Sequence, residues 1–119
     1  MVRTKSLTRI LALACLNSIS LLCEVITDGS LGLAQTINAA SSNYDIRADI
    51  GTSRGGNLFH SFTSFNIEEN HSATFHGTDA TKNILGRVTG GDPSLINGTL
   101  KTRGTNADLF LLNPAGIIF

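Results

Sequence analysis

The amino-acid sequence predicts an all-β fold. Short segments in which apolar and polar residues alternate recur along the chain, and such alternation turns one face of an extended strand toward a core. Clusters of Gly, Pro, Asn and Asp separate these segments, as turns between short strands require. The 119 residues include 12 Gly and no Trp, and only 6% are aromatic, which suits turns and polar strand faces. Alternation alone leaves two architectures open, a solenoid of stacked short strands and a two-sheet sandwich.

The first segment has the pattern of a targeting signal. Three basic residues lie within the first nine, and Ile10 to Leu22 forms an apolar stretch that is too short for a comfortable membrane span. Small residues precede Gln35 at the positions that a signal peptidase inspects, so we predict cleavage between Ala34 and Gln35. The chain is thereby divided into a signal peptide at residues 1–34 and one domain at residues 35–119.

Two alternatives to this cleavage remain open. A polar stretch from Glu24 to Ser30 separates the apolar stretch from Ala34, which makes a site nearer Ser20 the competing interpretation. The other alternative is a signal anchor that is not cleaved.

The predicted leader contains both cysteines of the chain. Cys15 and Cys23 both lie before the predicted cleavage site, so the mature domain is predicted to contain no cysteine. Exported domains often use disulfides. This domain would instead be held by packing and backbone hydrogen bonds alone.

The chain between the leader and residue 56 is expected to hold one strand. Gln35 to Asn43 is polar and is expected to be a loop. Tyr44 to Ile50 alternates, with its two isoleucines and its alanine on one face, which predicts a half-buried strand. Gly51 to Gly56 is a cluster of turn residues.

An aromatic block spans Asn57 to Ile67. Its phenylalanines recur every third residue, which fits neither the strand period nor the helix period, so we expect two short strands with a bend between them. Phenylalanine usually fills a core, and a partner-binding surface is the second interpretation. The residues concerned are Asn57, Leu58, Phe59, Phe62 and Phe65.

Further short strands are expected after the polar tip at Glu68 to His71. The run Asp108–Leu112 is apolar after its first residue, so both faces of that strand would require burial. A turn follows it, because proline fixes φ and glycine tolerates positive φ. The expected strands are Ser72–Phe75, an extended stretch with Ile96, Gly98 and Leu100 on one face, Asp108–Leu112, and a restart at Ile117–Phe119. Asn83–Val88 is moderately apolar and ends at the turn residues that follow it.

The sequence contains no pattern that indicates catalysis or a cofactor. Its formal net charge is zero, which argues against a nucleic-acid partner, and it lacks the glycine-rich nucleotide motifs and the nucleophile elbow. His60, His71 and His76 have no cysteine or well-placed carboxylate to complete a zinc site. We therefore predict no cofactor, no metal and no enzymatic activity.

Two blocks carry a resemblance to a known family. ILGRVTGGDPSLINGTLK followed by LFLLNPAGIIF, with GGNLFHSFTSFNI upstream, resembles the amino-terminal two-partner secretion (haemagglutination activity) domain of filamentous-haemagglutinin-type exoproteins. The resemblance covers roughly Ile37 to Phe119. It implies a right-handed single-stranded parallel β-helix of the pectin-lyase-like kind, here incomplete and preceded by a signal peptide.

The resemblance also implies a function. Such a module is the secretion signal of a large exported adhesin or haemagglutinin, and an outer-membrane β-barrel transporter with periplasmic POTRA domains recognises it. The chain would be exported through the periplasm and be secreted or held at the cell surface, where regions further along such a protein contact a host or neighbouring-cell receptor. The family's Asn-Pro-x-Gly-Ile turn falls on Asn113, Pro114, Gly116 and Ile117.

This chain departs from the family pattern in two places. Ala115 stands where Asn is frequent, and an Asn-Pro-Asn-Leu motif found in some relatives has no counterpart in Thr78 to Asn83. The turn at Asn113 is interpreted either as a recognition motif or as a coil corner only. The alternatives for the whole chain are a non-functional remnant and part of a β-helical polysaccharide-active enzyme. Such an enzyme would need a gathering of Asp45, Asp49, Arg54 or Asp92 that their spacing does not suggest.

Overall fold

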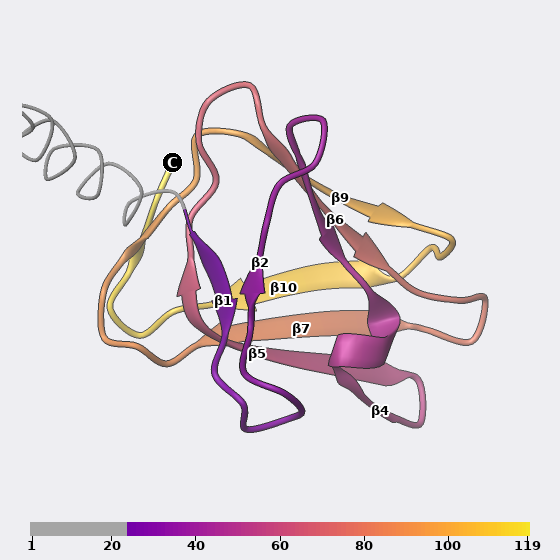
Figure 1. Ribbon diagram of the computed structural model, residues 1–119. Helices are drawn as coiled ribbons and strands as arrows, with labels where there is room; N and C mark the ends of the chain where they lie inside the picture. The colour runs from indigo at the N-terminus through magenta and orange to yellow at the C-terminus, as the bar shows by residue number, and fades with distance from the viewer. Residues whose placement is uncertain (1–23) are drawn as a thin grey trace, which may run out of the picture.

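The computed structural model describes residues 24–119, which form short β-strands and one 3-10 turn (Figure 1). The predicted leader lies outside these described residues up to residue 23. The strands are β1 (Val25–Thr27), β2 (Thr36–Ile37), β3 (Asn43–Ile46), β4 (Thr52–Arg54), β5 (Asn57–Phe65), β6 (Ser72–His76), β7 (Asn83–Val88), β8 (Ser94–Leu95), β9 (Thr99–Arg103), β10 (Asp108–Leu112) and β11 (Ile117–Ile118); the 3-10 turn is η1 (Ala48–Ile50).

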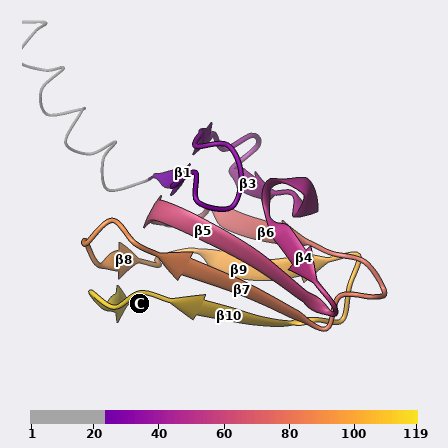
Figure 2. The same cartoon turned by 90° about the horizontal axis from the view of Figure 1, so that it is seen from below.

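Parallel ladders run through the second half of the chain. β5, β7 and β10 pair in parallel, as do β3, β6 and β9, and β8 with β11 (Figure 2). From β5 onward the chain runs from one of these stacks to the next in turn. One such circuit is called a pass here, and each of β6, β7, β9, β10 and β11 pairs in parallel with a strand that comes earlier in the chain. The pairing keeps register, with Leu58 opposite Ile84 and Ile84 opposite Leu109. Positions that face inward on one strand therefore face inward on the next.

Antiparallel strands close the end of the stack where the described chain begins. β1 pairs with β5 and with β2, and β4 forms a hairpin with the start of β5. The all-β prediction is confirmed. The sheets are mixed, because parallel pairing holds in the three stacks and antiparallel pairing holds at this end.

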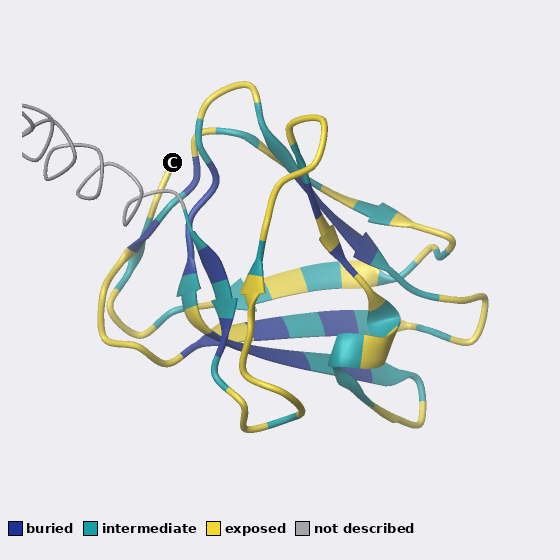
Figure 3. Ribbon diagram, viewed as in Figure 1, coloured by how far each residue is buried: buried dark blue, intermediate teal, exposed yellow. Residues whose placement is uncertain are grey.

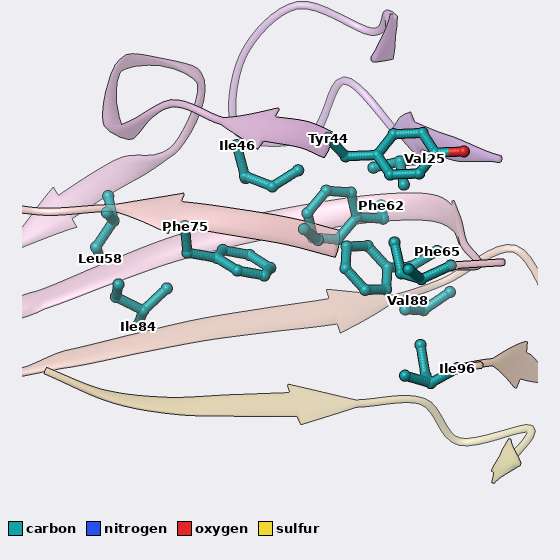
Figure 4. Close-up of a cluster of buried hydrophobic side chains, with 12 residues drawn as sticks. Val25, Tyr44, Ile46, Leu58, Phe62, Phe65, Phe75, Ile84, Val88 and Ile96 are labelled. Carbon is teal, nitrogen blue, oxygen red and sulfur yellow. The ribbon is translucent and has the colours of Figure 1, made fainter. Parts of the chain in front are cut away.

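The core lies between the two larger sheets (Figure 4). Its centre is a group of phenylalanine rings, with centroids 5.0 Å apart between Phe62 and Phe65 and 5.8 Å apart between Phe65 and Phe75. All three side chains are fully buried. Ile84 and Val88 of β7 pack against the same cluster (Figure 4). Buried residues alternate with more exposed ones along β7 (Figure 3). Rings at this spacing and tilt gain attraction beyond the burial of their area.

The aromatic block differs from its prediction. β5 is one strand of nine residues rather than two short strands. Its pairing with β1 shifts register at Thr63, since Ile26 lies opposite Ser64 while Thr27 lies opposite Phe62. A bulge of this kind adds one residue, which lets Phe62 and Phe65 both face inward although they are three positions apart and would lie on opposite faces of a regular strand. The expected bend is therefore a bulge within a continuous strand.

Two other predictions about strands are wrong in part. The strand expected over Tyr44–Ile50 ends at Ile46, and residues 48–50 form the 3-10 turn η1. The stretch from Ile96 to Leu100 is not one extended segment, because Gly98 lies in a corner where an added Cβ would come within 2.2 Å of the His71 carbonyl oxygen. Strands also occur within the expected loop and turn cluster, as β2 and β4. The strands predicted at 72–75, 108–112 and 117–119 are confirmed, with small differences at their ends. The moderately apolar stretch at 83–88 forms β7. Burial of both faces was expected for the strand at 108–112, but Phe110 and Leu112 on its outer face are exposed.

A carboxylate clasp holds β1 on the stack. Asp28 Oδ2 accepts hydrogen bonds of 2.6 Å from Ser61 Oγ and from Thr89 Oγ1, and Asp28 Oδ1 accepts from the Ser30 backbone N–H and Oγ. Burial raises the pKa of Asp28, but these hydrogen bonds outweigh it and hold the pKa well below its usual range. The ionised carboxylate thus ties the chain after β1 to β5 and to the end of β7.

His60 is buried without a polar partner. Its side chain is 2% exposed, and neither ring nitrogen has a hydrogen bond. The ring stacks on Phe62 and lies edge-on to Phe75, and a Cβ added at Gly51 would come within 2.8 Å of the ring carbon Cε1. Burial lowers the pKa of His60 to about 4, so the imidazole is neutral at pH 7.

Acid is expected to destabilise the fold through His60. The unfolded chain binds a proton at this residue near pH 6.5 and the folded chain only near pH 4, so stability falls as the pH drops through this window. The loss at pH 4 is about 3 kcal/mol in the free energy of unfolding. Urea titrations between pH 7 and pH 4 measure it. His60→Phe removes most of this slope, and an unchanged slope would contradict the assignment.

The start of the domain is expected to decide its stability. A chain that begins at Gln35 lacks β1, the fully buried Val25 and the Asp28 clasp, whereas a chain that begins at Glu24 keeps them. We expect the shorter chain to lose at least about 3 kcal/mol in the free energy of unfolding. Urea titration of the two chains measures the difference. Equal stability would mean that β1 contributes nothing and would favour cleavage at Ala34.

Candidate functional site

The corner at Asn113 joins two passes of the chain. After β10 the chain turns through residues 113–116, and β11 then pairs with β8. Asn113 Nδ2 donates to the Asp92 carbonyl oxygen and to Ser94 Oγ, each at 3.0 Å, and Asn113 Oδ1 accepts from the Ala115 backbone N–H at 2.9 Å. Both amide hydrogens therefore have acceptors on the preceding pass. The side chain shapes its own turn and fixes that turn to the corner beneath it.

The other residues of the turn have different surroundings. Pro114 and Ala115 are exposed, and Gly116 has φ of +113° with nothing near the position of an added Cβ. Glycine is required there by the backbone conformation rather than by lack of space. Ile117 is half-buried and lies opposite Ser94. The turn thus presents Pro114 and Ala115 to solvent while Asn113 and Ile117 hold it in place.

A polar column continues beneath this corner. Ser94 is 1% exposed, and its backbone N–H donates to the Gly116 carbonyl oxygen. Asn66 Oδ1, on the pass below, accepts from the Leu95 backbone N–H at 2.9 Å. Sequence reasoning missed Asn66 and Ser94, because their partners lie about 20 to 30 residues away and no local motif marks them. Three successive corners are therefore joined by side chains as well as by backbone ladders.

The aromatic block is divided between the two faces of β5. One face is buried in the core, as the core-filling interpretation expects, and it carries Leu58, Phe62 and Phe65. Phe59 is half-buried on the opposite face, and Asn57 Oδ1 accepts a hydrogen bond from Asn83 Nδ2 at 2.9 Å. Only part of this block is therefore available to a partner in the folded chain.

The predicted cleavage site lies in the connection between β1 and β2. Ala34 and Gln35 are exposed. The Gln35 backbone N–H donates to Thr27 Oγ1 at 2.9 Å, and its carbonyl oxygen accepts from the Thr27 N–H. Cleavage after Ala34 would separate β1 from the rest of the sheet.

One shallow hollow contains two carboxylates that were considered for catalysis and one histidine that was considered for a zinc site. Asp45, Asp49 and His76 line a hollow of about 290 Å³ together with Arg47, while Arg54 and Asp92 do not belong to it. His76 Nε2 contacts Asp45 Oδ1, and Asp49 pairs with Arg47 at 2.6 Å. The hydrogen bond from Arg47 lowers the pKa of Asp49, so this exposed carboxylate is not poised as a general acid. Within residues 24–119 no group of three or more potential metal ligands occurs.

Comparison with known proteins identifies one family. A family model described as "TPS secretion domain" matches residues 23–119. No curated protein matches the chain, and no solved structure does. Among the helices of the described part, none is long and apolar enough to cross a membrane.

Removing the amide of Asn113 is expected to weaken the corner. Asn113→Ala leaves the buried Ser94 hydroxyl and the Asp92 carbonyl without this donor, and we expect a loss of about 1–3 kcal/mol in the free energy of unfolding. Asn113→Asp keeps the bond to the Ala115 N–H but loses both donations, so it should be similarly unstable. Urea titration measures both variants. The matched control is Asn97→Ala at an exposed corner position, and an equal effect there would contradict the role of Asn113.

Proposed function

The chain belongs to the family of TPS secretion domains, the N-terminal domains of haemagglutinin-type two-partner secretion proteins, and from this premise we propose that it is the module by which an exported adhesin or haemagglutinin is delivered to its outer-membrane transporter. The observation that carries the proposal is the family match, which spans the whole described fold. The domain directs export to the cell surface or the extracellular space.

The proposed architecture is a right-handed parallel β-helix closed at its amino end. The three parallel stacks and the passage of the chain from one stack to the next support it. Each pass leaves backbone groups and an apolar edge unsatisfied until another pass covers them. The antiparallel β1, β2 and β4 would serve as the closure, because they cover β5 with strands that do not continue the parallel order.

The proposed route begins with the leader. The signal peptide takes the chain to the periplasm, and the POTRA domains of the β-barrel transporter bind the secretion domain there. Described residues 24–119 contain no cysteine, so no disulfide can close a loop in that part of the chain while it crosses the outer membrane. The mature chain would begin upstream of Val25, since that residue is fully buried in the fold.

The Asn113 turn would act in export through folding. Both of its amide hydrogens are bonded within the chain, so the folded protein does not offer them to a transporter. Loss of this residue would slow or weaken the attachment of one pass to the next. Pro114 and Ala115 remain the exposed part of the turn.

Export should depend on the transporter and on the stability of the corner. With a partner transporter of this family co-expressed, the full chain is expected in the medium, and without it the chain should remain in the periplasm. Asn113→Asp should reduce the exported amount several-fold. Immunoblots of medium and periplasm measure both, and equal export without the transporter would contradict the proposed function.

A control of matched stability separates folding from direct recognition. Ile96→Ala removes buried apolar contact at the same end of the core and is expected to destabilise by about 2–5 kcal/mol. If export follows stability in both variants, the corner acts through folding. If Asn113→Asp stops export while an equally unstable Ile96 variant is exported, the transporter reads Asn113 directly.

A further inference from the structure

Asn97 and Gly98 form the corner between β8 and β9, and the proposed function uses neither of them. Asn97 is exposed, and its side-chain amide makes no hydrogen bond to the described residues. The backbone N–H groups of Asn97 and Thr99 donate to the carbonyl oxygens of Ile67 and His71, at 2.8 and 3.0 Å. The Gly98 N–H between them has no acceptor in the described part of the chain. A free amide therefore lies next to a free backbone nitrogen.

These two groups can react with each other. The Gly98 nitrogen attacks Cγ of Asn97, the new N–Cγ bond closes a succinimide ring, and the Cγ–Nδ2 bond breaks. The proton of the Gly98 N–H leaves with the amide nitrogen as ammonia. Glycine favours this step, because it has no Cβ to hinder the attack and its backbone reaches conformations that other residues rarely adopt.

Water completes the reaction by opening the ring. If water adds at Cγ, the N–Cγ bond breaks and the product is aspartate. If water adds at the main-chain carbonyl carbon, the bond from that carbon to nitrogen breaks and the product is isoaspartate, whose main chain runs through the side-chain carbon atoms. Water is the only reactant besides the chain itself, and nothing is oxidised or reduced.

The other asparagines of the described part lack this combination. Each of them is followed by a residue that carries a side chain, and Asn113 is followed by a proline, which has no N–H to react. Asn70 is the nearest comparison, because it is also exposed at a corner. There the His71 N–H donates to the Glu68 carbonyl oxygen at 3.2 Å, so the attacking nitrogen is already engaged.

We propose that Asn97 is a site of spontaneous deamidation in the folded domain, and that water converts it to a mixture of aspartate and isoaspartate. The inference goes beyond the proposed function, because it depends on this corner alone and on no partner. The reaction needs no enzyme, so the converted fraction would record how long a chain has been folded.

Isoaspartate at this corner would weaken the join between two passes. It adds one carbon atom to the main chain between the two groups that are bonded to Ile67 and His71. The space beside Gly98 is filled, since even an added Cβ would come within 2.2 Å of the His71 carbonyl oxygen and 2.6 Å of Ile67 Cγ2. The lengthened chain therefore cannot keep both hydrogen bonds in place. Aspartate instead adds a charge at an exposed position and leaves the path of the main chain unchanged.

Peptide mapping of the full chain tests the site. The purified protein is kept folded at neutral pH, sampled over time and digested with trypsin, which cuts after Arg87 and Lys101. The peptide at residues 88–101 contains Asn97 as its only asparagine. Mass spectrometry follows the mass gain that accompanies loss of the amide, and electron-transfer fragmentation separates isoaspartate from aspartate. We expect Asn97 to convert an order of magnitude faster than any asparagine in the peptide at residues 55–82, which contains Asn70.

Two variants and one separated product complete the test. Asn97→Gln should abolish conversion in the peptide at 88–101, because its longer side chain closes a ring far more slowly. Asn70→Gln, at the other exposed corner, should leave the conversion of Asn97 unchanged. The isoaspartate form is separated from aged protein by ion exchange and compared with fresh Asn97→Asp in urea. We expect a lower urea midpoint for the isoaspartate form.

The outcomes decide both parts of the inference. Fast conversion of Asn97 in the folded chain, absent from Asn97→Gln, supports the site. If Asn97 converts no faster than Asn70, or converts only after urea has unfolded the chain, the site is wrong. Equal urea midpoints for the isoaspartate form and Asn97→Asp would show that the corner tolerates the extra carbon atom, which would overturn the effect on the join. Export does not enter any of these measurements, so the proposed function stands or falls separately.

Discussion

The fold depends on the packing of Phe62, Phe65 and Phe75 between two sheets. Phe62 and Phe75 lie edge-on with centroids 6.4 Å apart, and all three rings are fully buried. Phe62 and Phe65 come from β5 and Phe75 comes from β6, so this contact sets how the two sheets face each other. The bulge at Thr63 is the local feature that makes it, because without it one of the two β5 rings would point outward. Each later strand then copies the register of the strand beneath it.

Side-chain hydrogen bonds hold the corners and the amino end of the stack, which lie outside the aromatic core. The core lies in the middle of the strands, whereas the corners and the amino end of the stack carry backbone groups that need partners. Asp28 serves the amino end by joining β1 to β5 and β7, and Asn66, Ser94 and Asn113 serve successive corners. A small exported domain often uses disulfides for such places. Residues 24–119 contain no cysteine, and hydroxyl, amide and carboxylate groups take that role here.

Local pattern predicted the later strands well and the long-range contacts poorly. The strands at 72–75 and 108–112 were predicted because their residues and flanking turns agree on one conformation. The prediction that the strand beginning at residue 44 extends to Ile50 was wrong. Ala48 and Ile50 pack against the core from a 3-10 turn, so their apolar spacing looks like that of a strand although the backbone is not extended. The turn at Asn113 was located from the residues themselves, but its bonds to Asp92 and Ser94 were not. Those partners, like the Thr89 end of the Asp28 clasp, depend on how the passes stack, which no local spacing reveals.

The same long-range contacts suit a chain that is exported before it folds. Asp28 is held by Ser61 and Thr89, which lie 33 and 61 residues further along the chain, so the closure at the amino end forms only after β5 and β7 are in place. Contacts between residues so far apart must overcome the entropy of closing long loops, and folds dominated by them form slowly. A slow-folding chain remains extended for longer, which suits the proposed passage through an outer-membrane transporter. On the proposed route, each pass that folds outside the cell gains burial and corner hydrogen bonds from the one before it, and this gain in free energy opposes any return.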